Sequence, residues 1–449
     1  MTVDSVLTDA KAYLKGEIVD CSLAIEEGKI FKIGKQVNMP NADEKIDLHH
    51  MLVLPGIIDS HVHLRDQDKM YKETFLTGTA AAAAGGVTTV LDMPNNSPLT
   101  MNSETLRNRM EIASRRILVD VGFYSEFPPN LAEVKSIVAE GVVGFKLFMA
   151  EQIGGLNIDD DGAIKEAFAQ TGKHGVPVAV HAEDHNLIKT AVQNQKLKNH
   201  HSLAAFLKTH DEKTEIVAVN RLLNIARKTP KTRLHFCHLS TAAAIAAVAE
   251  AKTSGINVTA EATPHHLLLK KDDYQHLGAH ALTMPPLRTQ ENVEALWKGI
   301  AEKTVDTIGS DHAPHTPQEK DASSIWDVKV GVPGLETMLP LVLTLIHKDK
   351  LTLERALELL CEKPAEIFGL KDKGRLEQGK AADLTIVDFN QKFKIEVSKF
   401  KSKAKFSPFD KWEAQGKPIQ TFVNGSLVMD QGEIVAKPGS GHVIRRTQV

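Results

Sequence analysis

From Leu54 to about Arg375 the chain repeats one pattern, in which a short apolar segment is followed by a loop and then by a helix-like stretch. Such alternation is typical of parallel sheets covered by helices. Eight apolar segments fit strands, at residues 55–63, 87–93, 119–124, 142–148, 176–181, 234–238, 257–262 and 306–310. Eight strand–helix units in roughly 300 residues predict a (β/α)8 or TIM barrel. A doubly wound open sheet is the alternative, but no glycine-rich dinucleotide motif follows a strand.

The helical stretches between these segments carry recognisable ends. Residues 72–84 are alanine-rich and are followed by two glycines, which end helices. Residues 103–116 begin with a serine cap, and residues 159–175 begin with three acids suited to a helix N-terminus. Both chain ends instead show short strands and turns. We therefore expect three segments: residues 1–54 and 375–449 forming one small β domain, and residues 55–374 forming the barrel.

Composition excludes several classes of partner. The net charge is −3 with both signs mixed along the chain, which gives no support for binding nucleic acid or a membrane surface. The longest apolar runs, such as residues 338–346, are too short to span a bilayer. The 3 cysteines are far apart and odd in number, and the N-terminus lacks a signal-peptide core. We expect a cytoplasmic protein with a small-molecule substrate.

Residues able to bind a metal stand at the carboxyl ends of several predicted strands. Two histidines, His61 and His63, alternate along the first strand and face one side, as does Arg65 if the strand continues that far. In a barrel these strand ends meet at one mouth, and neutral imidazole is a common ligand of zinc and similar metals. The sequence therefore predicts a metal site at the mouth, formed by His61, His63, Lys146, His181, His238 and Asp311.

Lys146 is unusual in this set, because a protonated amine has no lone pair for a metal. Its neighbours Phe145, Leu147 and Phe148 are apolar, and apolar surroundings favour the neutral amine. A neutral amine can react with carbon dioxide to give a carbamate, whose two oxygens can bridge two cations. A buried lysine paired with an acid is the alternative.

Longer motifs extend the pattern beyond single residues. They are DSHVHLRD (59–66), LDMPN (91–95), GFKLF (144–148), VHAED (180–184), CHLS (237–240), EATPHHL (261–267), SDHAPHT (310–316), GVPGLET (331–337) and GKAADLTIVD (379–388). With these motifs the chain resembles the dihydroorotases of the amidohydrolase superfamily over nearly its whole length.

The resemblance implies two zinc ions with a bridging hydroxide. One ion would be held by His61, His63 and Asp311, and the other by His181 and His238, with Lys146 as an N6-carboxylysine bridge. The implied reaction is the reversible hydrolysis of the cyclic amide of (S)-dihydroorotate to N-carbamoyl-L-aspartate, a step of pyrimidine biosynthesis. Asp311 would carry the proton, and a homo-oligomer is possible.

The resemblance also implies that Arg65, Asn95 and His315 select the substrate, and a guanidinium does bind a carboxylate through two hydrogen bonds. A salt bridge to Asp66, Asp68 or another acid is the alternative for Arg65. For His265 and His266 we favour a structural or gating role over a role as metal ligands.

The chain departs from the family pattern at two places. Gln67-Asp68 stands where relatives often have Pro-Gly, and Met284 where many have an Asn along the substrate ring. Asp160-Asp161-Gly162 resembles an aspartate bridge found in relatives that lack the lysine, but we interpret it as a helix start. The rival functions are a hydantoinase or allantoinase, which need not bind a ring carboxylate, and a non-catalytic scaffold of the same fold.

Overall fold

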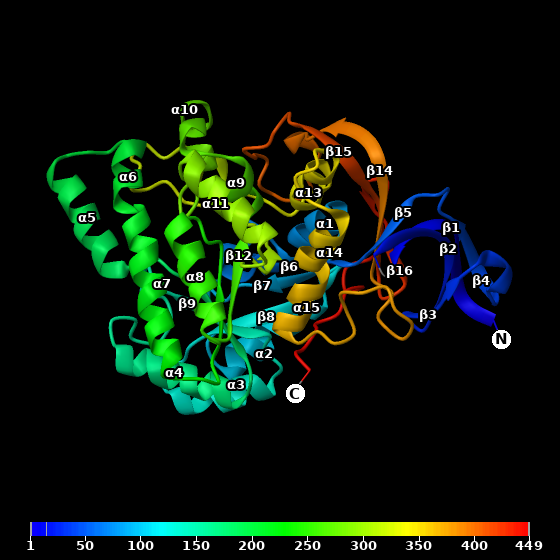
Figure 1. The fold of residues 1–449 in the computed structure, drawn as a ribbon, viewed down its shortest axis with the longest axis horizontal. Helices are drawn as coiled ribbons and strands as arrows, with labels where there is room; N and C mark the ends of the chain where they lie inside the picture. The colour runs from blue at the N-terminus through cyan, green and yellow to red at the C-terminus, as the bar shows by residue number, and fades with distance from the viewer. Residues whose placement is uncertain (1, 15, 448–449) are drawn as a thin grey trace.

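The computed structural model describes residues 2–14 and 16–447, which form two sheets with helices around one of them (Figure 1). Eight parallel strands lie in chain order in one sheet. The first and last strands meet where the His63 amide donates to the His312 carbonyl at 2.8 Å, so the sheet closes into the predicted barrel. The barrel strands are β6 (Ile57–Val62), β7 (Val87–Asp92), β8 (Asp120–Glu126), β9 (Gly144–Phe148), β10 (Pro177–His181), β11 (Arg233–Phe236), β12 (Val258–Ala262) and β13 (Thr307–Ile308).

The first predicted strand needs two corrections. Pro55 belongs to the other sheet, and the barrel strand begins at Ile57. The strand ends at Val62, and Arg65 has a φ of 56°, which lies in the left-handed region. The expectation that Arg65 shares a strand face with the histidines is therefore wrong. A turn, not strand alternation, decides where its side chain lies.

Helices surround the barrel, and the three expected helical stretches are confirmed as α1, α2 and α4. Asn102, rather than Ser103, caps α2, because its side chain accepts from the Thr105 amide. No helix in the described part of the chain is long and apolar enough to cross a membrane. The helices are α1 (Phe75–Ala84), α2 (Ser103–Ser114), α3 (Val134–Ala139), α4 (Asp161–Lys173), α5 (His185–Leu197), α6 (Leu203–Thr209), α7 (Glu212–Arg227), α8 (Ala242–Thr253), α9 (Pro264–Leu268), α10 (Tyr274–Leu277), α11 (Gln290–Ala301), α12 (Pro317–Lys320), α13 (Met338–His347), α14 (Leu353–Leu357) and α15 (Lys363–Phe368).

The second sheet joins the two ends of the chain and lies beside the barrel (Figure 1). β5 pairs antiparallel with β14, so an N-terminal strand and a C-terminal strand share one ladder. We keep the division into residues 1–54, 55–374 and 375–449 as a proposal. The strands are β1 (Thr2–Leu14), β2 (Glu17–Glu26), β3 (Lys29–Gly34), β4 (Asn41–Asp47), β5 (Leu52–Pro55), β14 (Leu384–Lys394), β15 (Glu413–Val423), β16 (Ser426–Asp430) and β17 (Glu433–Ile434).

The amino end of the barrel is filled by apolar side chains and covered by α15. Phe368 packs edge-on against Tyr124, with ring centroids 5.6 Å apart, and both rings are buried. The Tyr124 hydroxyl donates to the Ser60 carbonyl at 3.0 Å, which satisfies the polar tip of a buried ring. The barrel interior is thus filled by packed side chains at this end.

Candidate active site

A cavity of about 160 Å³ lies at the carboxyl ends of the barrel strands. Lys146 is fully buried below it, and His315 lies behind Arg65, away from the cavity wall. The structure therefore brings seven of the nine predicted residues to one cavity: His61, His63, Arg65, Asn95, His181, His238 and Asp311.

Hydrogen bonds fix the orientation of both histidines at the end of β6, His61 within the strand and His63 just after it. Nδ1 of His61 lies 2.8 Å from a Glu261 carboxylate oxygen, and Nδ1 of His63 lies 2.7 Å from Oδ1 of Asn95. Each acceptor is an oxygen, so each Nδ1 carries the proton and each Nε2 keeps its lone pair. Both Nε2 atoms lie 3.4 Å from the same Asp311 carboxylate oxygen. Two lone pairs and one carboxylate therefore converge.

His181 and His238 form a second converging pair. Nε2 of His181 donates to the Glu183 carboxylate at 2.9 Å, so its Nδ1 lone pair faces inward. That Nδ1 lies 3.2 Å from Nε2 of His238. Nδ1 of His238 is buried and has no partner among the described residues. Glu183 is itself held by His210, whose Nδ1 lies 3.0 Å away.

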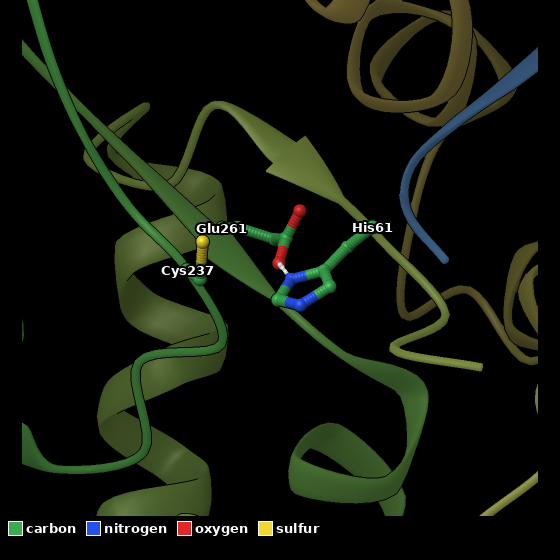
Figure 2. Close-up of side chains that lie close together, drawn as sticks. All are labelled: His61, Cys237 and Glu261. Carbon is green, nitrogen blue, oxygen red and sulfur yellow. Dashed lines mark hydrogen bonds and ion pairs between the residues drawn. The ribbon is translucent and has the colours of Figure 1, made fainter. Parts of the chain in front are cut away.

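Lys146 lies between the two pairs. Its Nζ is 3.5 Å from Nε2 of His61 and donates to the Cys237 thiol at 3.1 Å. It lies 5.0 Å from the centre of the Phe148 ring. Figure 2 shows the Glu261 carboxylate bonded to the His61 ring, with Cys237 beside them. The described residues provide no ion pair for Lys146 within this site, so the alternative of a lysine paired with an acid finds no support.

Burial controls the protonation of these groups. It lowers the pKa of His61 to about 4, with the charge of Lys146 acting in the same direction. Burial also lowers the pKa of His63 and His238 well below the usual range. Burial raises the pKa of Asp311, although His61 and Lys146 oppose the rise. His61, His63 and His238 are therefore neutral near pH 7, which is the form that binds metals.

The spacing of these atoms fits metal ions. Two ligand atoms on one tetrahedral zinc ion, each bonded at about 2.0–2.1 Å, lie about 3.3–3.4 Å apart. The His61–Asp311, His63–Asp311 and His181–His238 separations are 3.4, 3.4 and 3.2 Å. His61, His63 and Asp311 also form a group whose ligand atoms all lie within 4.8 Å of one another. The inward lone pairs of His61, His63 and His181 agree with this fit.

A second group of potential ligands is His61, Cys237 and Glu261. Here the Glu261 carboxylate already accepts from Nδ1 of His61 and from the Ser60 hydroxyl. Burial raises the pKa of the Cys237 thiol to about 12, so its thiolate form is disfavoured. This group orients His61 and is a poorer metal site than the first.

Arg65 is a buried cation without an anionic partner in the described chain. The nearby acids are engaged elsewhere, Asp66 with Arg116 at 2.9 Å and Asp92 with Arg109 at 2.6 Å. Nε of Arg65 is buried and has no hydrogen-bond partner. Burial lowers the pKa of Arg65 to about 10, which still leaves it charged at pH 7. A salt bridge is therefore not its role in this structure.

His315 lies next to Arg65 but does not accept a hydrogen bond from it. Nη2 of Arg65 lies 3.4 Å from Nε2 of His315, but that nitrogen donates to the Val330 carbonyl at 2.9 Å. The other ring nitrogen accepts from Lys72 at 3.1 Å. Burial and the neighbouring Arg65 lower the pKa of His315, so the ring is neutral. Both ring nitrogens are thus occupied by the protein itself.

The remaining predicted positions behave as follows. Asp160 caps α4 through the Gly162 and Ala163 amides, which supports its interpretation as a helix start. Met284 lines the cavity wall. The ring of His266 spans the Thr263 hydroxyl and the Pro285 carbonyl, as expected of a structural residue.

Sequence reasoning missed the carboxylates that hold the rings of His61 and His181. Glu261 stands at the end of β12 within the quoted EATPHHL motif, and Glu183 stands two residues after His181. Their signal was a carboxylate at or just after a strand end, the same signal that marked the histidines. Cys237 and Lys72 carried no sequence signal that separates them from ordinary residues.

The fold and this cavity together define a class, the barrel enzymes whose polar and metal-capable side chains gather at the carboxyl ends of their strands. Residues 52–428 match the amidohydrolase family, and the chain belongs to it. It is a hydrolase that acts on cyclic amides.

The most similar proteins divide between two activities. A dihydroorotase of Bacillus cytotoxicus is 38% identical over 92% of this chain and 95% of its own length. An L-hydantoinase of Paenarthrobacter aurescens is 32% identical over 99% of this chain and 98% of its own. Among solved structures, an L-hydantoinase (dihydropyrimidinase) from Arthrobacter aurescens matches with a TM-score of 0.94 and 30% identity, covering 99% of this chain and 100% of its own.

Proposed function

We propose that the protein catalyses the reversible hydrolysis of the cyclic amide of (S)-dihydroorotate to N-carbamoyl-L-aspartate. The observation that carries the proposal is Arg65, a buried guanidinium in the wall of the active-site cavity with no anionic partner among the described residues. Burying an unpaired charge is costly, so such a cation is retained where a ligand supplies the anion. Dihydroorotate carries a carboxylate on its ring and meets this requirement.

The residues of the cavity divide the work of binding. Arg65 binds the substrate carboxylate with two hydrogen bonds. Oδ1 of Asn95 accepts from His63, so its amide NH2 remains free to donate to the substrate. His315 lies against Arg65 and is itself fixed by Val330 and Lys72. Together these contacts fix the ring over Asp311, and such positioning removes part of the entropic barrier.

Metal ions complete the proposed site. Two zinc ions, one held by His61, His63 and Asp311 and one by His181 and His238, would lower the pKa of a bound water and polarise the amide carbonyl. Asp311 accepts the proton of the attacking water and passes it to the leaving nitrogen. Its burial and raised pKa bring the carboxylate closer to the pKa that suits proton transfer near neutral pH.

Lys146 is proposed to be carboxylated on Nζ and to bridge the ions. The support is its buried position, with Nζ 3.5 Å from Nε2 of His61 and no ion pair to any residue that the structure describes. Electron density of the metal-loaded protein, or its native mass at neutral pH, reads the modification directly. The proposal also includes a cytoplasmic location, supported by three buried free cysteines.

Hydantoin hydrolysis is the second candidate function. The L-hydantoinase relative and its structural counterpart cover almost the whole chain. Met284 adds an apolar side chain to the cavity wall, which suits an uncharged substituent on a substrate ring.

A substrate panel separates the two functions. The metal-loaded protein is assayed with dihydroorotate, carbamoyl-aspartate, hydantoin and allantoin. We expect the highest kcat/KM for the first two. Arg65→Met should lower kcat/KM for dihydroorotate by roughly 10–150-fold, the equivalent of about 1.5–3 kcal/mol for a hydrogen bond to a charged group. Metal content should stay the same.

Arg65→Lys is the matched control, because it keeps the charge and loses the paired hydrogen bonds. Its kcat/KM should lie between those of the wild type and the methionine variant. Equal loss of hydantoin and dihydroorotate activity in Arg65→Met would show that Arg65 does not bind the carboxylate. Preference for hydantoin in the wild type would favour the second candidate.

A further inference from the structure

A second cavity, of about 770 Å³, lies at the opposite end of the barrel from the active site. Gly175 and Arg233, at the amino ends of β10 and β11, form part of its wall. The rest comes from the helical segment 358–366, which carries three glutamates, from residues 369–380 that follow α15, and from Arg446 near the end of the described chain. None of the residues of this wall belongs to the active site described above.

Arg446 is the central feature of this cavity. The residue is 7% exposed, and its side chain makes no hydrogen bond or ion pair with any residue that the structure describes. Its buried Nη1 is among the atoms without a partner. The guanidinium lies beside Gly369, where a Cβ would come within 3.4 Å of Cζ and Nη1, so a larger residue there would crowd it. A buried cation of this kind requires an anion.

Capping of helix ends does not account for Arg446. The carbonyls of Gly175 and Ile367, at the carboxyl ends of α4 and α15, are taken by Arg233 at 3.0 and 2.9 Å. Arg446 is therefore a second guanidinium beside one that already satisfies these helix ends. Burial and the charge of Arg233 lower the pKa of Arg446 to about 10, so both are charged at pH 7.

The rim of the cavity adds further unpaired positive charge. Lys363 pairs with Glu366 and Arg375 with Glu362, so these cations are neutralised. Lys371 and Lys380 also line the cavity, and within the described residues neither forms an ion pair. With Arg233 and Arg446, four cationic side chains surround the cavity without a carboxylate partner.

The charge and the wall together define the ligand. Several cations around one space match a multiply charged oxyanion, and guanidinium groups match phosphate oxygens in geometry. None of the described wall residues is aromatic, so a flat ring would find nothing to stack on. We propose that this cavity binds a phosphoryl group, either as free phosphate or as part of a phosphorylated small molecule.

The site is connected to the active site by two strands. β10 runs from Pro177, next to Gly175 and Val176, to His181, and β11 runs from Arg233 towards His238. The amino ends of these strands touch the phosphate cavity and their carboxyl ends carry the second histidine pair. A ligand that fixes Arg233 and Arg446 would therefore act on the strands that position those histidines.

Calorimetric titration of the full-length, metal-loaded protein tests the proposal. Inorganic phosphate and ribose 5-phosphate are the two probes, and we expect saturable binding of one equivalent. Tighter binding of ribose 5-phosphate would identify a phosphate ester as the ligand, and equal binding would identify free phosphate. Arg446→Met should weaken binding at least tenfold, whereas Arg445→Met, an exposed neighbour, should change it less than twofold.

Two further variants test the site without the risk that Arg446→Met fails to fold. The double change Lys371→Met and Lys380→Met removes rim charges with little risk to folding, and it should weaken binding in the same direction. Arg65→Met should bind the probes as the wild type does, because Arg65 lies in the other cavity. The proposal is overturned if neither probe binds saturably, if Arg446→Met binds like the wild type, or if Arg65→Met abolishes binding.

Discussion

The Asp311 carboxylate lies both beside two histidines and in the wall of the active-site cavity. One of its oxygens lies 3.4 Å from Nε2 of both His61 and His63, as a shared ligand requires. The same group lines the active-site cavity, where we propose that the substrate amide lies. Its φ of 47° is in the left-handed region, which costs energy for a residue other than glycine. The surrounding structure therefore holds Asp311 in a conformation that the local chain disfavours.

Replacement of Asp311 by asparagine separates these two roles. Asp311→Asn keeps the size and one possible oxygen ligand, but the amide cannot accept the proton. Turnover should fall by roughly 10²–10⁴-fold, the range typical of general acid–base catalysis. The measurement is kcat together with metal content. Asp161→Asn, at the exposed start of α4, is the control and should retain full turnover. Near-normal kcat in Asp311→Asn with metals bound would assign the proton transfer to another group.

The strand ends act as units in which a histidine and a carboxylate come from different elements. His61 from β6 donates to Glu261 from β12, and the Glu261 carboxylate also accepts from the Ser60 hydroxyl. The bond from Nδ1 of His61 to Glu261 fixes the ring tautomer that points the Nε2 lone pair into the site, and the Ser60 hydroxyl helps to hold the carboxylate. The orientation of the proposed ligand His61 therefore depends on how elements of the barrel are packed.

Glu261→Gln should weaken metal binding at this site. A glutamine amide can donate to Nδ1 of His61 as well as accept from it, so the tautomer with an inward lone pair is no longer enforced. Loss of such a supporting group typically lowers metal affinity about 10–100-fold. Metal dissociation constants from competition with a chelating dye provide the measurement. Glu250→Gln, on the exposed face of α8, should keep the wild-type constant. An unchanged constant in Glu261→Gln would remove the supporting role.

At the scale of the whole molecule, one buried charge cluster joins the barrel to the second sheet. Nζ of Lys373 lies 2.7 Å from Asp120 of β8 and also bonds Asp383, which precedes β14. The Asp120 carboxylate also accepts from the Asn424 side chain and the His442 amide. The two acids raise the pKa of Lys373, so the lysine stays charged although buried.

Lys373→Met should destabilise the protein strongly. It leaves two carboxylates facing one another in a buried site, and breaking a buried pair in this way typically costs about 3–5 kcal/mol. Urea unfolding gives the free energy of unfolding directly. Lys392→Met changes an exposed lysine on β14 and should stay within about 0.5 kcal/mol of the wild type. Equal stabilities of the two variants would show that the cluster does not hold the two sheets together.

The sequence by itself determined the elements and their order. Strand periodicity and helix-end residues are local properties, and they predicted all eight barrel strands and the return to strands at both chain ends. The strand-end rule then placed His61, His63, His181, His238 and Asp311 at one mouth. These predictions succeeded because each depends on a few neighbouring residues and on a fold with one defined geometry.

Only the tertiary structure decided which groups meet across elements. β6 ends at Val62 and a turn follows, so the alternation of side chains along a strand could not predict where the Arg65 side chain lies. Arg65 lacks an anionic partner because other arginines neutralise the nearby acids. Arg109 of α2 pairs with Asp92, and Arg116, just after α2, pairs with Asp66. Glu261 meets His61 across 200 residues of sequence. Such pairings depend on distances between side chains in the folded chain, which local sequence patterns do not encode.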